Sequence, residues 1–178
     1  LNTTGAKNTA VGSLALDANT TGVENVAIGE QALTTNTTAS YNTSVGGESM
    51  KANTTGAQNA ALGQRALFAN TTGSYNSSVG LSSLGNNTTG TENAAVGYLA
   101  LYQNTTASNN TAMGKSALQA NTTGHSCVGV GHSALAANTT ALNNTAVGAS
   151  ALLANTTGDE NTAVGALCLD ANTTGHAN

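Results

Sequence analysis

The tripeptide Asn-Thr-Thr recurs at a constant spacing along the chain, and this period constrains the fold more than any other feature. It starts at Asn2, returns at Asn19, and continues without a change of spacing to Asn172. Such a period indicates one small unit that is copied and stacked, because each copy buries its apolar surface against its neighbours. Ten complete units run from Asn8 to Ala177, so we predict a single repeat array over residues 1–178, and expect it to be a segment of a longer fibre.

Aligning the ten units on the first, residues 8–24, groups the chain into 17 columns, each named after its residue in that unit. Some columns barely vary: the Gly12 and Asn19 columns are invariant, the Val11 column is always aliphatic, and the Leu16 column is Leu except at Met50. This restriction indicates that these positions are set by the packing of one unit on the next.

Other columns are permissive, and all charged residues, histidines and aromatic residues of the chain fall in five of them. These are the columns of Ser13, Leu14, Asp17, Val23 and Glu24. Scattered charges would not gather in this way, so we predict that these five columns face water and that most of the other twelve do not.

Each unit contains two segments compatible with β-structure. Residues 8–11 end at Gly12, and residues 14–18 end at the turn formed by residues 19–22. In the first segment Thr9 and Val11 would share one face, with Ala10 on the other. In the second, Leu16 and Ala18 would share a face, and we expect the Val11 and Leu16 columns to supply the large core side chains.

A helix over residues 12–18 also fits the pattern, because positions 11, 15 and 18 recur near a 3.6-residue period. Strands stack about 4.8 Å apart, whereas helices need about 8 to 10 Å, and a 17-residue coil cannot absorb that difference. We therefore predict an all-β protein, a parallel β-solenoid or β-roll with one 17-residue repeat per coil and about ten coils. A strand-plus-short-helix horseshoe and a disordered tract are the alternatives.

Two large apolar side chains per coil do not offset the backbone entropy of ordering the whole coil. We therefore expect hydrogen-bonded ladders between coils and the burial of a second face against other chains. Stacked identical amides suit such a structural ladder. The predicted ladder consists of Asn19, Asn36, Asn53, Asn70, Asn87, Asn104, Asn121, Asn138, Asn155 and Asn172.

Composition and charge exclude several classes of partner. The net charge is −4 and only four residues are basic, so the chain lacks the basic patch that binding to nucleic acid or an anionic membrane surface requires. No apolar run is long enough to cross a membrane, so we expect no membrane insertion by this segment. We find no nucleophile and base in a recognisable pattern and no phosphate-binding loop, and therefore predict neither an enzyme nor a cofactor.

The Asn-Thr-Thr turns are also N-glycosylation sequons, and further candidate glycosylation sites are Asn42, Asn76, Asn109 and Asn143. Sugars on every coil would lie about 4.8 Å apart, which is closer than branched glycans pack. The Asn19 column is therefore better explained as a structural ladder than as a glycosylated edge.

The remaining reactive side chains are scattered. Cys127 and Cys168 fall in different columns about 10 Å apart along the axis, beyond the reach of a disulfide. His125 and His132 lie in different exposed columns and His176 three coils further on, which does not predict a metal site. A regular threonine array would suit ice binding, but that pattern needs two outward columns at alternate positions, and Thr20 and Thr21 are adjacent.

The segment Asn8-Thr9-Ala10-Val11-Gly12-x-x-Ala15, which recurs at residues 25–32 and 93–100, resembles the head repeats of trimeric autotransporter adhesins of the YadA type. It also resembles repeats of bacterial surface proteins and of phage tail fibres that end in a self-cleaving chaperone domain. The resemblance implies a left-handed parallel β-roll that forms a homotrimer. The turn at residues 19–22 is an insertion relative to the adhesin repeat, which affects the coil cross-section and the trimer contact.

These observations together predict a non-catalytic extracellular structural fibre or adhesin shaft, located outside the cell or on its surface. We expect self-association as a homotrimer and end-to-end stacking into filaments, with variable side chains such as Tyr41 and Phe68 displayed outward. The alternative is a binding module, either a phage tail-fibre shaft on a virion that recognises host glycans or an ice-binding solenoid. A glycan or another surface receptor is the partner that these roles imply.

Overall fold

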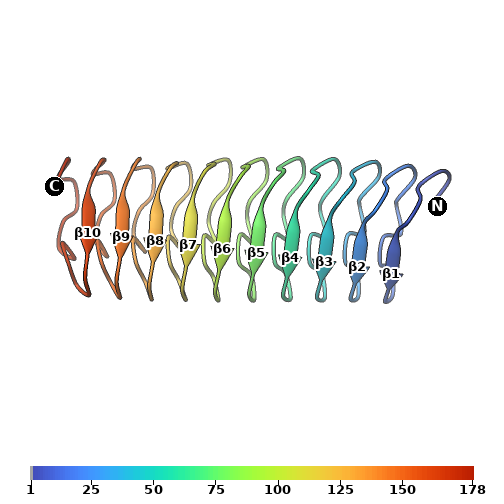
Figure 1. Ribbon diagram of the computed structural model, residues 1–178, viewed down its shortest axis with the longest axis horizontal. Helices are drawn as coiled ribbons and strands as arrows, with labels where there is room; N and C mark the ends of the chain where they lie inside the picture. Colours follow the sequence, from blue (N-terminus) through green and yellow to red (C-terminus); the bar gives the residue numbers. More distant parts are fainter. Residues whose placement is uncertain (1) are drawn as a thin grey trace.

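The computed structural model describes residues 2–178, which form an all-β solenoid with one short strand in each coil. The ten strands lie side by side in chain order and form one parallel sheet (Figure 1). This confirms the predicted fold class. The strands are β1 (Thr9–Val11), β2 (Val26–Ile28), β3 (Thr43–Val45), β4 (Ala60–Leu62), β5 (Ser77–Val79), β6 (Ala94–Val96), β7 (Thr111–Met113), β8 (Val128–Val130), β9 (Thr145–Val147) and β10 (Thr162–Val164).

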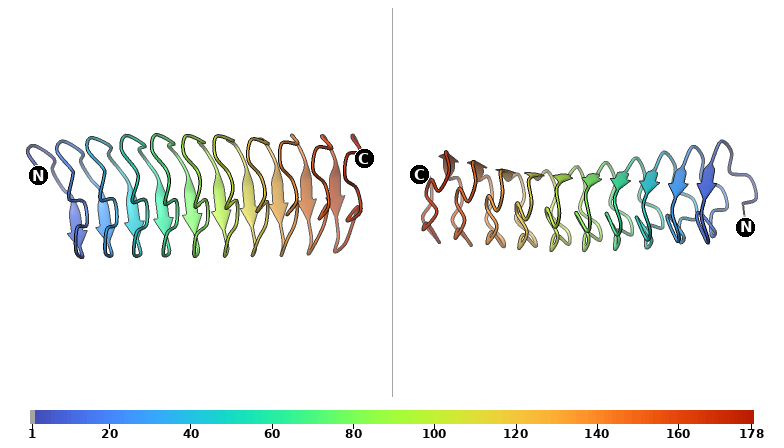
Figure 2. Two further views of the ribbon diagram at one scale, coloured as in Figure 1. Left: turned by 180° about the vertical axis from the view of Figure 1, so that it is seen from behind. Right: turned by 90° about the horizontal axis from the view of Figure 1, so that it is seen from below.

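The register of the sheet never changes from coil to coil. Ala10 pairs with Ala27, and every later pair is likewise one full repeat apart, so each column of the sequence is a straight row in space. The strands occupy one side of the rod and the turn segments the other (Figure 2). The constant register follows from the constant repeat length, because an added residue in one coil would move its side chains to the opposite face.

The interior of the coil holds fewer large side chains than the sequence predicts. The middle residue of the strands faces inward, as Ala27 and Ala95 do with no exposed surface, and the buried Leu16 column lies against it. The expectation that the Val11 column lies in the core is wrong, since inner members such as Val96 and Met113 are still 39% and 47% exposed. One leucine per coil fills the lumen, which leaves room on the facing strand only for small side chains.

The second predicted β segment is also wrong: residues 14–18 and their equivalents form turns. Within one such turn Gln31 and Leu33 have positive φ of 56° and 52°, with Ala32 between them. In a strand, successive side chains point to opposite faces, and residues with left-handed φ break this alternation. The consecutive side chains of Ala32 and Leu33 are therefore both fully buried. Each left-handed non-glycine residue costs about 1 to 2 kcal/mol, which is offset by bonds to the next coil such as Leu33 N–H to Ser49 O at 3.1 Å.

Two coils place a hydroxyl pair inside this apolar lumen. Ser44 and Ser78 replace alanine in the Ala10 column, and the same coils carry Ser49 and Ser83 in the Ala15 column. Ser44 Oγ donates to Ser49 O at 2.9 Å, and Ser78 Oγ is hydrogen-bonded to Ser83 Oγ. Each of these hydroxyls also reaches a backbone carbonyl, Ser49 O for Ser44 and Ser83 O for Ser78, so its burial is compensated by a hydrogen bond.

Polar groups inside the rod are fully paired. Throughout residues 2–178 every buried side-chain nitrogen and oxygen atom has a hydrogen-bond partner. The same part of the chain contains no helix long and apolar enough to cross a membrane.

Candidate functional site

The ten asparagines of the predicted ladder lie in one row along the rod, and all of them except Asn172 are fully buried. Asn87 illustrates the geometry: its Nδ2 donates to Asn70 Oδ1 at 2.9 Å and to Gly90 O at 3.0 Å, and its Oδ1 accepts a hydrogen bond from Asn104 Nδ2 at 2.8 Å. Every member from Asn19 to Asn172 donates the same two bonds. The row is thus a continuous chain of side-chain amides that connects each coil to the one before.

A second asparagine row, which the sequence reasoning did not assign to a ladder, runs parallel to the first in the Asn8 column. Asn59 Oδ1 accepts the backbone N–H of Asn76 at 2.9 Å, and Asn59 Nδ2 donates to Gly73 O at 2.9 Å. Gly73 O also accepts Asn70 Nδ2, so the two rows meet at one carbonyl in each coil. The near-invariance of this column was the sequence signal that could have revealed the second ladder.

The threonines of the turn divide into a bonded row and an exposed row. Thr88 Oγ1 donates to Thr105 O at 3.0 Å, and other members of the Thr20 column make the same contact. Thr89 and its equivalents in the Thr21 column are exposed. This corner of the rod therefore presents one outward threonine row rather than two.

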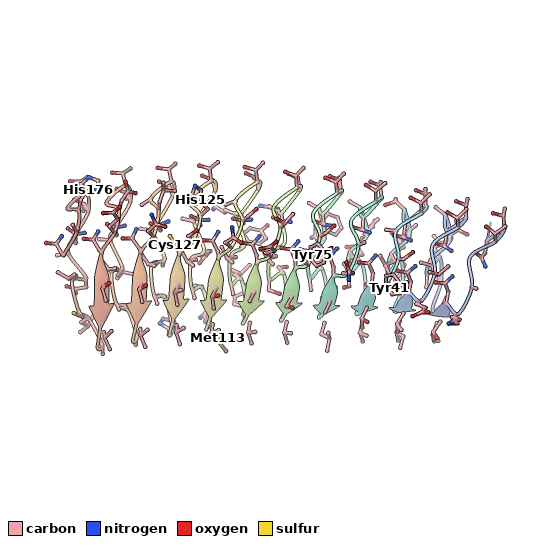
Figure 3. The ribbon with its side chains drawn as sticks, turned by 45° about the horizontal axis from the view of Figure 1, so that its top comes forward. Tyr41, Tyr75, Met113, His125, Cys127 and His176 are labelled. Atoms are coloured by element: carbon pink, nitrogen blue, oxygen red, sulfur yellow. The ribbon has the colours of Figure 1, made fainter. Side chains whose placement is uncertain are left out.

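Cys127 replaces asparagine in the second row and interrupts it. Its backbone N–H still bonds to Asn110 Oδ1 at 2.9 Å, but its thiol reaches Ala141 O only as a weak donor at 3.3 Å, and the sulfur faces the backbone N–H of Asn144. Burial raises the pKa of the Cys127 thiol, which keeps it protonated and unreactive. Cys168 is also a free thiol, so neither cysteine forms a disulfide. In Figure 3 Cys127 lies within the coil, whereas His125 lies near its upper edge.

Cys127→Asn is expected to stabilise the protein by about 1 to 2 kcal/mol, because it replaces weak sulfur contacts with two amide hydrogen bonds. The gain is measured as a higher midpoint in urea under reducing conditions. Cys168→Ala is the control, since the Ala15 column contains mostly alanine and makes no side-chain ladder. A Cys127→Asn midpoint equal to that of the wild type would contradict the role assigned to the second row.

The candidate glycosylation sites fall into two structural groups. Asn42 and Asn76 belong to the second ladder and are buried, with Asn42 Nδ2 donating to Gly56 O at 2.9 Å. Asn109 and Asn143 lie in the Glu24 column, are exposed, and have left-handed φ of 62° and 56°. A sugar on Asn42 or Asn76 would break a ladder bond, whereas Asn109 and Asn143 present their amides to solvent.

The outer side of the sheet carries a continuous row of aliphatic side chains, and we call the Val11 and Thr9 columns together the aliphatic face. Met113 is 47% exposed and points away from the body of the rod (Figure 3). Among the twenty positions of this face none is charged. Its Val11 column consists of Val11, Ile28, Val45, Leu62, Val79, Val96, Met113, Val130, Val147 and Val164. An uncharged strip of this extent, with an aliphatic side chain in every coil, is unusual on a soluble monomer.

Charged side chains lie elsewhere on the rod and form few contacts. None of the charged residues between 2 and 178 is buried, as the permissive columns predict. Asp159 approaches His176 at 3.8 Å. The described residues contain no group of three or more histidine, cysteine or carboxylate side chains placed to hold a metal ion. Comparison of the chain with family models, with curated proteins and with solved structures finds no match.

Proposed function

We propose that this array is a non-catalytic structural shaft of an extracellular or cell-surface fibre, in which parallel copies associate side by side. The single observation that carries the proposal is the uninterrupted stacking of identical coils. Rows of backbone, asparagine and threonine hydrogen bonds link each coil to the next along the described chain. A rod whose coils are linked by such rows of bonds resists bending and separates what is attached to its two ends.

The surface of the rod supports a display role as well as a spacer role. The five permissive columns vary freely while the ladders beneath them stay constant, so side chains change without disturbing the stack. Tyr41 and Tyr75 are 55% and 57% exposed and lie on the same column two coils apart. Ten coils at about 4.8 Å give a rod of about 48 Å. Such a rod suits the shaft of an adhesin or of a tail fibre.

Lateral association follows from the aliphatic face. Its ten aliphatic residues form a strip about 45 Å long at the strand spacing, which a second and third copy of the chain would remove from water. Parallel copies in one register place identical columns opposite one another, so a single uncharged face suffices for all contacts. We assign the homotrimer, which the adhesin-like repeat implies, to this face.

Two charges on this face are expected to dissociate the assembly. In the assembly, Val96→Glu combined with Met113→Glu would bury carboxylates between copies. In a single chain both positions are exposed, so each tolerates a charge. Sedimentation equilibrium of the purified chain is expected to give three times the chain mass for the wild type and the single-chain mass for the variant. Gln58→Glu with Gln64→Glu adds the same charge on permissive columns and is expected to stay trimeric. A monomeric wild type, or a variant that keeps the trimer mass, would refute lateral association through this face.

A further inference from the structure

A small surface cavity on the rod lies between two aromatic rings, with a basic cluster beside it. The cavity has a volume of about 30 Å³ and is lined by Arg65, Phe68, Ser82, Gly85, Asn86 and Tyr102. Two of the four basic residues of the chain, Lys51 and Arg65, lie here. The cluster therefore stands out on a rod whose net charge is −4.

The Asp17 column explains how the cavity forms. It carries Phe68, Gly85 and Tyr102 in three successive coils, so a glycine separates two rings that are about 10 Å apart along the axis. The Tyr102 ring leans over Gly85, where an added Cβ would lie 2.9 Å from the ring. Both rings are half-buried, in contrast to the more exposed Tyr41 and Tyr75. The absence of a side chain at Gly85 thus creates a recess with aromatic walls.

Arg65 lines this recess, and its half-exposed side chain has hydrogen-bond donors to spare. Its guanidinium carbon lies 4.4 Å from the centroid of the Phe68 ring, a favourable cation–π geometry. Lys51 Nζ engages the Glu48 carboxylate at 2.9 Å, and Arg65 Nε stays 3.7 Å from it, beyond hydrogen-bond distance. No acceptor among residues 2–178 receives a hydrogen bond from the terminal guanidinium nitrogens of Arg65. The cluster of two cations and one carboxylate keeps a net positive charge.

Two further polar side chains beside the cavity are equally available. The hydroxyl of Ser82 and the side-chain amide of Asn86 form no hydrogen bond with residues 2–178, and Asn86 is exposed. A cation, a hydroxyl and an amide beside the Tyr102 ring offer one charged contact, several polar contacts and a flat apolar surface. A carboxylate-bearing sugar supplies the complementary groups, namely an anion, ring hydroxyls and a face of C–H bonds that packs on an aromatic ring.

We propose that this recess binds an acidic monosaccharide unit of a glycan, with the sugar carboxylate on Arg65. The cavity has room for a small substituent and not for a whole ring, so the carboxylate enters it and the ring lies outside against Tyr102. Ser82 and Asn86 bond the neighbouring hydroxyls. Charged hydrogen bonds to Arg65 are the largest contribution, and the aromatic wall orients the ring.

The test is a titration of the purified chain with methyl glucuronide, followed by amide chemical shifts. We expect shifts confined to the coils that carry Arg65, Ser82 and Tyr102. Arg65→Gln is expected to weaken binding about tenfold to a hundredfold, the effect of losing one charged hydrogen-bonded contact. Gly85→Ala, which keeps every polar group but displaces the Tyr102 ring, is expected to weaken it as well. Both columns tolerate these residue types, so the variants are expected to fold.

Matched probes and variants separate this site from non-specific binding. Lys115→Gln removes a positive charge that lies three coils from Arg65 and outside the lining of the cavity, and it is expected to leave the affinity unchanged. Methyl glucoside, which lacks the carboxylate, and acetate, which lacks the ring, are each expected to bind at least about tenfold more weakly than the glucuronide. Absence of shifts with the glucuronide, equal binding of acetate, a preference for an acidic peptide, or equal loss in Lys115→Gln would overturn the proposal. None of these results depends on whether the shaft is trimeric.

Discussion

Gly97→Ala is expected to destabilise the array by about 3 to 6 kcal/mol, the combined effect of backbone strain and overpacking. Gly97 has φ of +136°, a conformation that residues with a Cβ rarely adopt. In this conformation the added Cβ would point along the rod, at 2.5 Å from Gly114 O and 2.6 Å from its carbonyl carbon. Both obstacles are backbone atoms of the next coil, which cannot move without separating the stack. Denaturation in urea and amide hydrogen exchange measure the loss.

Two other glycines separate the causes of that effect. Gly165 has a similar φ of +130°, but its added Cβ would meet only Cys168 Cβ, at 3.9 Å. Gly165→Ala therefore reports the backbone strain alone, and we expect about half the loss or less. Gly47 has no atom within 4 Å of an added Cβ and an ordinary φ, so Gly47→Ala should cost nothing. If Gly97→Ala and Gly165→Ala cost the same, the close approach of successive coils would be refuted.

Asn87→Ala is expected to cost about 3 to 5 kcal/mol, since three hydrogen bonds are lost in a fully buried position. Two are donated by Asn87 to Asn70 and Gly90, and the third leaves the amide of Asn104 without its acceptor in the preceding coil. Because stacked repeats depend on their nearest neighbours, the damage is expected on both sides of the substituted coil. Amide hydrogen exchange should therefore show reduced protection in the coils of Asn70 and Asn104.

The same substitution at the edge of the ladder provides the control. Asn2 is exposed and donates one bond, to Gly5 O at 2.7 Å, while accepting one from Asn19. Asn2→Ala is expected to cost about 1 kcal/mol or less, because water reaches the groups left behind. A loss at Asn2 equal to that at Asn87 would indicate that the buried row adds nothing beyond local turn bonds.

The repeat made much of this architecture predictable. A strict period with one invariant glycine and one invariant asparagine required identical coils, and the stacking distance of strands favoured a β-solenoid over helices. The split of the strand into two faces was also predictable from Thr9, Ala10 and Val11. Which face lies inside was not, because the sequence marks both the Ala10 and the Val11 columns as restricted.

The cavity beside Arg65 likewise could not be predicted from the sequence. The sequence revealed that the aromatic residues occupy permissive columns, but not that Gly85 lets the Tyr102 ring fold toward Phe68. Neighbours along a column are a full repeat apart in the chain and in van der Waals contact in the rod. Only the stacked structure shows which of them meet.

Residue identity alone determined the length of one coil, the five columns that hold every charged side chain, and the amide row from Asn19 to Asn172. The tertiary structure decided that the Val11 column faces outward and that Leu14 and Leu16 take left-handed φ, at positions where no glycine announces it. The physical reason is that a lumen of fixed width admits one leucine per coil. The chain accepts local backbone strain to place that leucine inside, and the hydrogen bonds between coils offset the strain.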